Sequence, residues 1–460
     1  MTQSLPRIFL AAAHKSSGKT TVAIGLAAAL RRKGRRVRMF KKGPDYIDPL
    51  WHRLASGRDS YNLDFNTQQP DEMRDLFVRK GADADICLVE ANKGLYDGID
   101  LEGRDSNAAL AKMLDAPVVL VIDTEGMTRG IAPLLIGYRE FGEGLHIAGV
   151  ILNRVGTPRH EDKLRAAVER YTDVEVLGAV ARDSSLVLEE RHLGLTTPGD
   201  MAALDERIAA IGARIGGSVD LDRLEAIAAA AAPVRHVPQG PISPPAADVR
   251  IAIARDAAFC FYYPDDLEAF AQAGAELVPF SPIADTALPE NVDGLFLGGG
   301  FPETHMAALA ANASMRESVR RAIDSGLPAY AECGGLMYLA ETLAWQGEKQ
   351  QMCGAVPARA VMNARPQGRG TIRLAATGAA PWSPVRAGGL VAAHEFHYAS
   401  LHGLSDADVY AWEVRRGHGI TGRHDGIVIG NLVAGFTHLR NTRQSPWVRA
   451  FVDFVRRRRG

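Results

Sequence analysis

Residues 14–21, with the sequence HKSSGKTT, have the types and spacing expected of a loop that binds phosphate groups. In such a loop backbone N–H groups surround phosphate oxygens, a lysine neutralises the terminal phosphates, and the next hydroxyl holds magnesium. Gly18-Lys19-Thr20 matches the end of the pattern G-x-x-x-x-G-K-[ST], but Ala13 stands where the first glycine belongs. The missing glycine removes no phosphate-binding group; the alternative is an ordinary strand-to-helix turn that contains Gly-Lys-Thr by chance. The residues that we predict to contact ATP are Ser16, Ser17, Gly18, Lys19, Thr20 and Thr21.

Acidic residues follow two further predicted strands. Asp45 and Asp48 lie in a loop just beyond the strand at 35–40, and Glu90 ends the strand at 84–90. Magnesium bound to a nucleotide takes a hydroxyl, one or two carboxylates and waters. We therefore predict that Thr20, Asp45 and Glu90 hold Mg²⁺. Lys41 and Lys42 would face the same crevice and compensate its anionic groups.

A second candidate for chemistry is Cys333, which lies between an apolar strand and a helix in GLPAYAECGGLMYL, residues 326–339. The small residues Ala331 and Gly335 flank it at minus two and plus two, as in a nucleophile elbow. A lone cysteine is usually buried and inert, but this placement predicts a nucleophile. Glycines before and after it would let backbone N–H groups approach an oxyanion, as acyl transfer requires. These glycines are Gly298, Gly299, Gly300 and Gly334.

A cysteine nucleophile needs a base, which should be a histidine from elsewhere in the chain. The candidates are His394, His397 and His438. His394 and His397 would also allow a metal site with Glu395, but on a strand they point to opposite faces, which argues against joint ligation. We therefore predict that His438, which follows a short strand near the end of the chain, is the base.

The elements that must position these residues alternate along the first 210 residues. Apolar runs without polar alternation predict strands buried on both faces, and amphipathic stretches between them, such as residues 20–34, predict helices. This pattern implies a doubly wound, mainly parallel α/β sheet with ligands at the carboxyl ends of its strands. The five runs are residues 7–13, 35–40, 84–90, 116–123 and 146–153.

Composition divides the chain into two α/β domains. A run of alanines gives way to five prolines within residues 226–248, without apolar periodicity, which is typical of a linker. Strands resume near residue 249. We predict a P-loop domain at 1–230, a linker at 231–248, a second domain at 249–445, and a C-terminal helix with a basic tail at 446–460. The run Arg456–Arg459 is expected to be solvated and frayed.

The overall composition excludes several classes of protein. The 460 residues carry a net charge of -1 and 47% hydrophobic residues, values typical of a globular protein without a nucleic-acid or membrane-surface partner. The four cysteines are far apart, so neither a disulfide framework nor a zinc site is indicated, and a reducing, cytoplasmic compartment is expected. No apolar stretch approaches the length of a membrane span.

Taken together, the motifs resemble the glutamine-dependent tetrapyrrole amidases of the cobyrinate a,c-diamide synthase family. The resemblance covers nearly the whole chain, in order and spacing. The segments that carry it include SSGKTT, FKKGPDYIDP, GLYDG, LFLGGGFPE, YAECGGLMYL, HEFHY and FTHL.

The resemblance implies an enzyme with two sites. The first domain resembles dethiobiotin-synthetase-like P-loop proteins, and the second resembles class I glutamine amidotransferases of the cobyrinate and cobyrate type. The resemblance implies that His438 activates Cys333, which attacks glutamine and releases ammonia. ATP would convert a carboxylate of the tetrapyrrole into an acyl phosphate, and ammonia would displace the phosphate to give an amide. The family often ends in His-Leu-His, whereas this chain has Arg440 in the last place. Ordinary class I enzymes place a glutamate two residues after the histidine; none is present, so the third member of the triad is unassigned.

The substrate is left open between two tetrapyrroles. Cobyrinate is the family default, whereas Asn92-Lys93 in place of the usual Val-Met favours a branch that amidates siroheme. In either case Lys93 is a candidate contact for substrate carboxylates. The sequence also leaves open whether the protein forms a homodimer.

Two rival functions remain at this stage. An amidase of the same fold could act on another carboxylate, such as a cell-wall precursor. A regulatory P-loop ATPase with a degenerate second domain would need a signature lysine five residues before Lys19, where this chain has His14.

Overall fold

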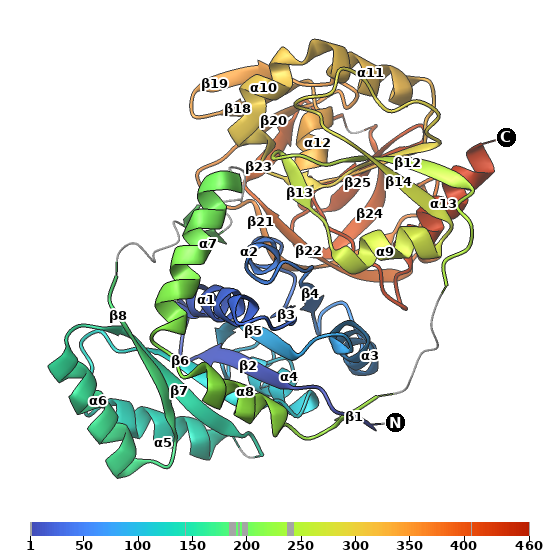
Figure 1. Ribbon diagram of the computed structural model, residues 1–460. Coiled ribbons are helices and arrows are strands. Elements are labelled where there is room, and N and C mark those ends of the chain that lie inside the picture. Colours follow the sequence, from blue (N-terminus) through green and yellow to red (C-terminus); the bar gives the residue numbers. More distant parts are fainter. Residues whose placement is uncertain are drawn as a thin grey trace. The chain divides into compact units, whose positions relative to one another are not determined.

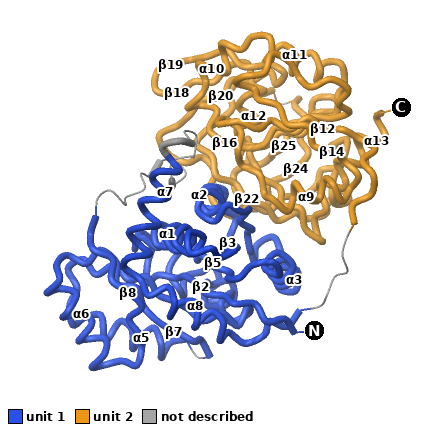
Figure 2. The backbone as a smooth tube through the Cα atoms, in the orientation of Figure 1, with its two compact units in different colours: residues 1–240 blue, residues 241–460 orange. Residues whose placement is uncertain are grey.

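The computed structural model describes residues 2–142, 144–183, 190–191, 194–195, 201–236, 243–405 and 407–459. The chain forms two compact units, residues 1–240 and 241–460 (Figure 2), and each is described by itself.

The centre of the first unit is a seven-stranded sheet in the order β4-β3-β5-β2-β6-β7-β8 (Figure 1). Every pairing in it is parallel, so the predicted doubly wound α/β fold is confirmed. β2 lies between β5 and β6, which brings the carboxyl ends of β2, β3 and β5 to one edge. The strands are β2 Arg7–Ala12, β3 Val37–Lys42, β4 Tyr61–Leu63, β5 Ile86–Gly94, β6 Val118–Asp123, β7 Ile147–Val155 and β8 Val176–Ala181.

The five predicted apolar runs correspond to β2, β3, β5, β6 and β7, whose residues are almost entirely buried because helices cover both faces. The three-residue β4 and the six-residue β8 lie outside the predicted runs. The helices are α1 Lys19–Arg32, α2 Ile47–Ser56, α3 Pro70–Gly81, α4 Asn107–Met113, α5 Ile131–Phe141, α6 Pro158–Tyr171, α7 Met201–Gly216 and α8 Leu221–Ala229. Two-residue strands complete the unit: β1 Thr2–Gln3, β9 Glu190–Arg191, β10 Gly194–Leu195 and β11 Val234–Arg235.

The second unit contains a nine-stranded sheet in the order β14-β12-β15-β17-β26-β25-β24-β21-β22. Its first five strands pair in parallel, and the other four extend the sheet antiparallel. The strands are β12 Val249–Ala254, β14 Ala275–Phe280, β15 Gly294–Leu297, β17 Ala329–Glu332, β21 Gly368–Ala376, β22 Leu390–His397, β24 Val409–Arg416, β25 His424–Ile429 and β26 Leu432–Gly435.

Smaller elements and helices surround that sheet. β13 Phe259–Phe261 pairs with β16 Gly299–Gly300, and a four-stranded sheet consists of β18 Thr342–Trp345, β19 Glu348–Gln351, β20 Arg359–Met362 and β23 Ala399–His402. The helices are α9 Pro264–Gln272, α10 Met306–Ala311, α11 Ala313–Asp324, α12 Gly334–Leu339 and α13 Trp447–Arg458, with the 3₁₀ turn η2 at Pro302–His305.

Two expectations at the domain edges need correction. Residues 234–235, inside the predicted linker, form β11 and pair with β1 of the first unit, with Val234 fully buried. The basic run is helical rather than frayed, because α13 packs its apolar face into the core, while Arg457, Arg458 and Arg459 are exposed as expected. Arg456 bonds Asp248 at 2.6 Å. No helix among the described residues has the length and apolar character needed to cross a membrane.

Candidate active sites

The predicted phosphate loop connects β2 to α1, as the motif requires. Ser16 and Gly18 have left-handed backbones, with φ of 68° and 78°, which turns the chain sharply before Lys19 begins the helix. Asn153, at the end of β7, donates from Nδ2 to the Ser17 carbonyl at 2.8 Å. Tyr138 donates to the Ala13 carbonyl at 2.6 Å. The irregular loop is therefore held from neighbouring elements rather than by a first glycine.

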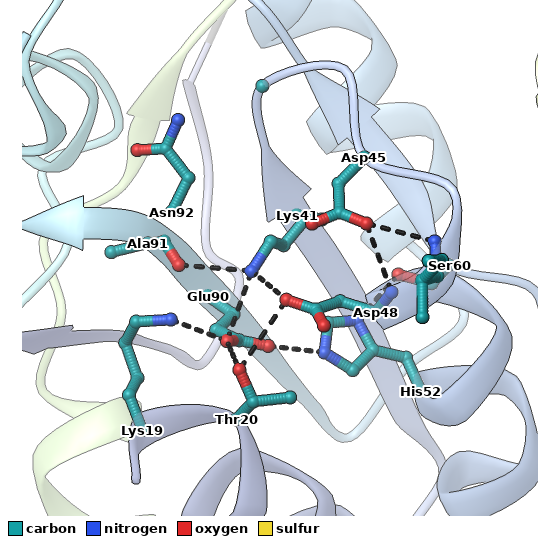
Figure 3. Close-up of polar contacts among 12 residues, drawn as sticks. Lys19, Thr20, Lys41, Asp45, Asp48, His52, Ser60, Glu90, Ala91 and Asn92 are labelled. Carbon is teal, nitrogen blue, oxygen red and sulfur yellow. Dashed lines mark hydrogen bonds and ion pairs between the residues drawn. The ribbon is translucent and has the colours of Figure 1, made fainter. Parts of the chain in front are cut away.

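Glu90 is the centre of the polar cluster beside this loop (Figure 3). It is fully buried, and one oxygen, Oε1, lies 2.5 Å from Lys19 Nζ and 2.6 Å from Thr20 Oγ1. Lys41 Nζ lies 3.1 Å from the same oxygen. The other oxygen, Oε2, bonds His52 Nε2 at 2.5 Å. Side chains from the loop, β3 and α2 thus meet at one carboxylate on β5.

Opposite charges balance each other in this buried cluster. Burial raises the pKa of Glu90, but the ammonium groups of Lys19 and Lys41 outweigh it and hold that pKa well below its ordinary value. Burial lowers the pKa of Lys19, and Glu90 only partly offsets this. For Lys41 the carboxylates of Asp48 and Glu90 overcome burial and raise the pKa. Glu90 is thus ionised and available to a cation.

The structure distinguishes Asp48 from Asp45. Asp48 lies in the first turn of α2, forms an ion pair with Lys41, and has Oδ2 3.5 Å from Thr20 Oγ1. Asp45 instead directly precedes the N-cap residue Tyr46, and its Oδ1 accepts from the backbone N–H groups of Ile47 at 2.9 Å and Asp48 at 3.1 Å in the first turn of α2. Burial and the charge of Asp48 raise the pKa of Asp45 to about 6. Asp48, not the predicted Asp45, contacts the loop hydroxyl.

The donors in this cluster fit a magnesium ion that arrives with a nucleotide. Thr20 supplies a hydroxyl, Glu90 a carboxylate directly beside it, and Asp48 a second carboxylate; phosphate oxygens and waters complete such a site. Among the described residues no three His, Cys, Asp or Glu side chains form a metal site on their own.

Lys42 and Lys93 differ from Lys41 in their surroundings. Lys42, at the end of β3, is buried, and burial is the main cause of its lowered pKa, with Lys93 adding to it and Asp105 opposing it. Lys93, near the end of β5, is exposed. Neither side chain bonds Glu90 in the part of the chain that is described, so both remain candidates for an anionic ligand.

In the second unit Cys333 occupies the sharp turn between β17 and α12. Its backbone, at φ 48° and ψ −101°, lies outside the regions that most residues adopt, as expected for a nucleophile elbow. The Cys333 backbone N–H donates to the Gly435 carbonyl at 2.7 Å. β17 and β26 pair with Glu332 opposite Gly435. The neighbouring strand therefore fixes the position of the cysteine.

His438 follows β26 and completes a pair with Cys333. Its side chain hydrogen-bonds to Cys333 and to Glu332, with Nδ1 3.3 Å from Glu332 Oε2. Burial lowers the pKa of His438, but these two partners outweigh burial and raise it to about 10. The imidazole is therefore poised to hold a proton beside the thiol.

The predicted oxyanion glycines have different surroundings. The Gly298 N–H donates to the Tyr262 hydroxyl at 3.0 Å and is not free for a ligand. Gly299 lies against the imidazole, where an added Cβ would come within 2.6 Å of His438 Cε1. A Cβ added at Gly334 would come within 3.0 Å of the Gly300 backbone nitrogen, so these two glycines also lie close together. Gly299, Gly300 and Gly334 thus remain beside the cysteine.

The other histidines have structural surroundings. His394 pairs its backbone with that of His438, and burial together with that neighbour lowers its pKa to about 3. His397 stacks on Phe436 with ring centroids 4.0 Å apart. His394 and His397 lie three residues apart on β22, so the alternation of a strand places their side chains on opposite faces. All four cysteines are free, and burial raises the pKa values of three of the thiols to about 12: Cys87, Cys260 and Cys353.

Sequence reasoning missed two residues of these sites. His52 lies in α2 rather than at a strand end, and only the fold brings it to Glu90. Glu332 stands beside Cys333 in an otherwise apolar strand. A charged side chain in such a strand needs a buried partner, so the single carboxylate in this strand was the sequence signal that could have identified Glu332 as a site residue.

Comparisons with known proteins agree with this two-part geometry. The family described as "CobQ/CobB/MinD/ParA nucleotide binding domain" matches residues 8–195, and "CobB/CobQ-like glutamine amidotransferase domain" matches residues 250–445. A cobyrinate a,c-diamide synthase of Magnetococcus marinus is 44% identical over 100% of this chain and 99% of that protein. Proteins of the same name from Syntrophotalea carbinolica and Listeria monocytogenes are 40% and 38% identical, over 98% and 94% of this chain and 99% and 96% of theirs.

Proposed function

The chain belongs to the cobyrinate a,c-diamide synthase family, and on this premise we propose that it uses ATP and glutamine to amidate the a and c carboxylates of a tetrapyrrole. The default substrate is cobyrinate, in cobalamin biosynthesis. The observation that supports the proposal is the presence in one chain of two clusters with the residues such a reaction needs, the Glu90 cluster beside a phosphate loop and the Cys333–His438 pair at an elbow.

In the second unit the reaction begins on glutamine. The raised pKa of His438 favours transfer of the thiol proton to the imidazole, and the Cys333 thiolate then attacks the side-chain amide carbon of glutamine. N–H groups of Gly299, Gly300 or Gly334 stabilise the oxyanion. The proton returns to the leaving nitrogen, ammonia departs, and water then hydrolyses the thioester to glutamate.

In the first unit the γ-phosphoryl group of ATP passes to an oxygen of the substrate carboxylate, and ADP leaves. Positioning and charge neutralisation dominate such a transfer. Lys19 and the loop N–H groups bind phosphate oxygens. Thr20, Glu90 and Asp48 would hold Mg²⁺, which supplies positive charge to the transferring group. Ammonia then attacks the acyl phosphate and displaces phosphate, which leaves a primary amide.

Loss of Cys333 tests the division of labour between the sites. In Cys333→Ala we expect glutamine hydrolysis to fall to background, while ATP-dependent amidation with added ammonium continues, because phosphoryl transfer uses other residues. Cys353→Ala, at another buried thiol of the same unit, is the matched control and should keep glutamine hydrolysis. Unchanged glutamine hydrolysis in Cys333→Ala contradicts the proposal.

The tetrapyrrole is decided by a substrate panel. Asn92-Lys93 in place of the usual Val-Met pair keeps siroheme as a second candidate, since these residues lie on β5 two and three residues after Glu90. The enzyme would be incubated with cobyrinate, hydrogenobyrinate and siroheme, each with ATP, Mg²⁺ and glutamine. Mass spectrometry should find one or two amides on cobyrinate; amides on siroheme alone would overturn the default. Amidation of none of them would favour the rival substrates.

A further inference from the structure

We propose that Glu332, the residue directly before the nucleophile, is the positioning residue that orients His438 for the glutamine reaction. This inference rests on the proposed function of the Cys333–His438 pair and supplies the acidic partner that the sequence lacks after His438. Its basis is the set of contacts around one buried carboxylate.

The Glu332 carboxylate is buried and its two oxygens have separate partners. Oε1 accepts from the Tyr330 hydroxyl at 2.6 Å and from the Leu439 backbone N–H at 2.9 Å. Oε2 lies 3.3 Å from His438 Nδ1. Leu439 directly follows His438, so the same carboxylate anchors both the backbone and the ring of the histidine segment.

The carboxylate also determines which ring nitrogen carries a proton. An ionised carboxylate only accepts, so Nδ1 must donate to Oε2. Nε2 is then left to accept the proton of the Cys333 thiol, with which the ring is hydrogen-bonded. This is the function that an aspartate performs behind the histidine of a Ser-His-Asp triad. Here the acid reaches the ring from the strand that carries the nucleophile.

Other groups near His438 do not offer this contact. His394 of β22 faces the ring, with centroids 6.3 Å apart, but burial lowers its pKa and keeps it neutral. Asp425 of β25 accepts from the backbone N–H groups of Phe436 and Thr437, both at 3.0 Å. Among the described residues Glu332 is the carboxylate that bonds the imidazole.

Glu332→Gln tests the inference with little change in shape. Because Oε1 accepts from two donors, the glutamine carbonyl should occupy that place and its NH₂ group should face His438 Nδ1. Nδ1 must then accept, which moves the ring proton to Nε2, where it blocks proton uptake from Cys333. By analogy with the same change in a serine protease triad, we expect kcat for glutamine hydrolysis to fall about 10²–10⁴-fold.

A pH profile separates positioning from simple structural damage. Losing one of the two partners that raise the pKa of His438 should move the basic limb of kcat/KM for glutamine hydrolysis to lower pH. Glu395→Gln is the matched control: Glu395 is also buried, bonds backbone N–H groups at 2.7 and 2.8 Å, and lies 3.6 Å from His397. Glu395→Gln should leave the basic limb of the pH profile for glutamine hydrolysis unchanged.

The outcomes separate this inference from the function on which it rests. Glutamine hydrolysis that survives in Cys333→Ala removes both. If Cys333→Ala is inactive but Glu332→Gln hydrolyses glutamine within about threefold of wild type, or loses activity without a shift of the basic limb, the positioning role is wrong. If Glu332→Gln does not fold, Glu332→Asp serves instead: its carboxylate retreats by one methylene, and wild-type activity would contradict the need for this contact.

Discussion

Gly18→Ala gives a quantitative test of how the irregular phosphate loop is held. Gly18 has φ 78°, and an added Cβ would lie 2.2 Å from Asn153 Nδ2. The Asn153 side chain would have to rotate away and give up its hydrogen bond to the Ser17 carbonyl. Gly34, just beyond the other end of α1, has φ 85° with no atom within 4 Å of an added Cβ. Gly34→Ala is therefore the matched control.

The two variants share one cost and differ in another. A left-handed alanine costs about 1–2 kcal/mol, and the stiffer unfolded chain returns about 0.4–1 kcal/mol, so Gly34→Ala should lower the free energy of unfolding by about 1 kcal/mol. An acceptor left without its partner in a buried site costs about 1–3 kcal/mol more. Gly18→Ala should therefore lose about 2–4 kcal/mol in total.

Urea unfolding followed by circular dichroism measures the difference in the free energy of unfolding between the two variants. The relevant unfolding transition is the one that moves to higher urea concentration when nucleotide is bound. Calorimetric titration with a non-hydrolysable ATP analogue should show weaker binding in Gly18→Ala and unchanged binding in Gly34→Ala. In the double variant Gly18→Ala/Asn153→Ala the losses should be less than additive, because the clash and the hydrogen bond are removed together. Equal stability of the two single variants, within about 0.5 kcal/mol, would refute this account of the loop.

Two further predictions address the two sites. Asp48→Asn should raise the Mg²⁺ concentration needed for half-maximal ATP-dependent amidation by about tenfold or more. Asp45→Asn should change that concentration little, because the asparagine side-chain oxygen accepts backbone N–H groups at the start of a helix as well as aspartate does. Equal effects of the two variants would contradict the assignment of Asp48 as the metal ligand. Gly335→Ala would bring a Cβ within 2.3 Å of the Leu297 carbonyl oxygen. It should abolish glutamine hydrolysis and leave ammonium-dependent amidation intact, and activity with glutamine near wild type would show that the elbow tolerates the added methyl group.

The sequence allowed most of the parallel sheet and the two reactive centres to be predicted, because both depend on local patterns. Buried strands such as β2 and β6 are continuous apolar runs, and Cys333 stands out at a strand-to-helix turn. The family resemblance is confirmed by relatives that match the chain throughout. From spacing we chose Asp45 rather than Asp48 as the metal ligand, but the start of α2 directs Asp45 to backbone N–H groups and Asp48 toward Thr20.

Partners that arise from tertiary structure were out of reach. His52 reaches Glu90 because α2 packs beside β3 and β5, which no spacing along the chain encodes. The acid behind His438 was sought after the histidine, where ordinary class I enzymes carry it. Glu332 reaches that ring because β17 pairs with β26, a contact between segments that are distant in sequence.

The pairing of β17 with β26 has a consequence for how this domain can change over evolution. The chain leaves β17 at Cys333 and returns to β26, the neighbour of β17 in the sheet, shortly before His438, after forming α12 and β18–β25. The distance between Cys333 and His438 is thus set by the spacing of hydrogen-bonded strands, about 4.8 Å, rather than by the length of the chain segment that connects β17 to β26. Loops in the segment between β17 and β26 can therefore lengthen, shorten or acquire new contacts during evolution while Cys333 and His438 keep their geometry.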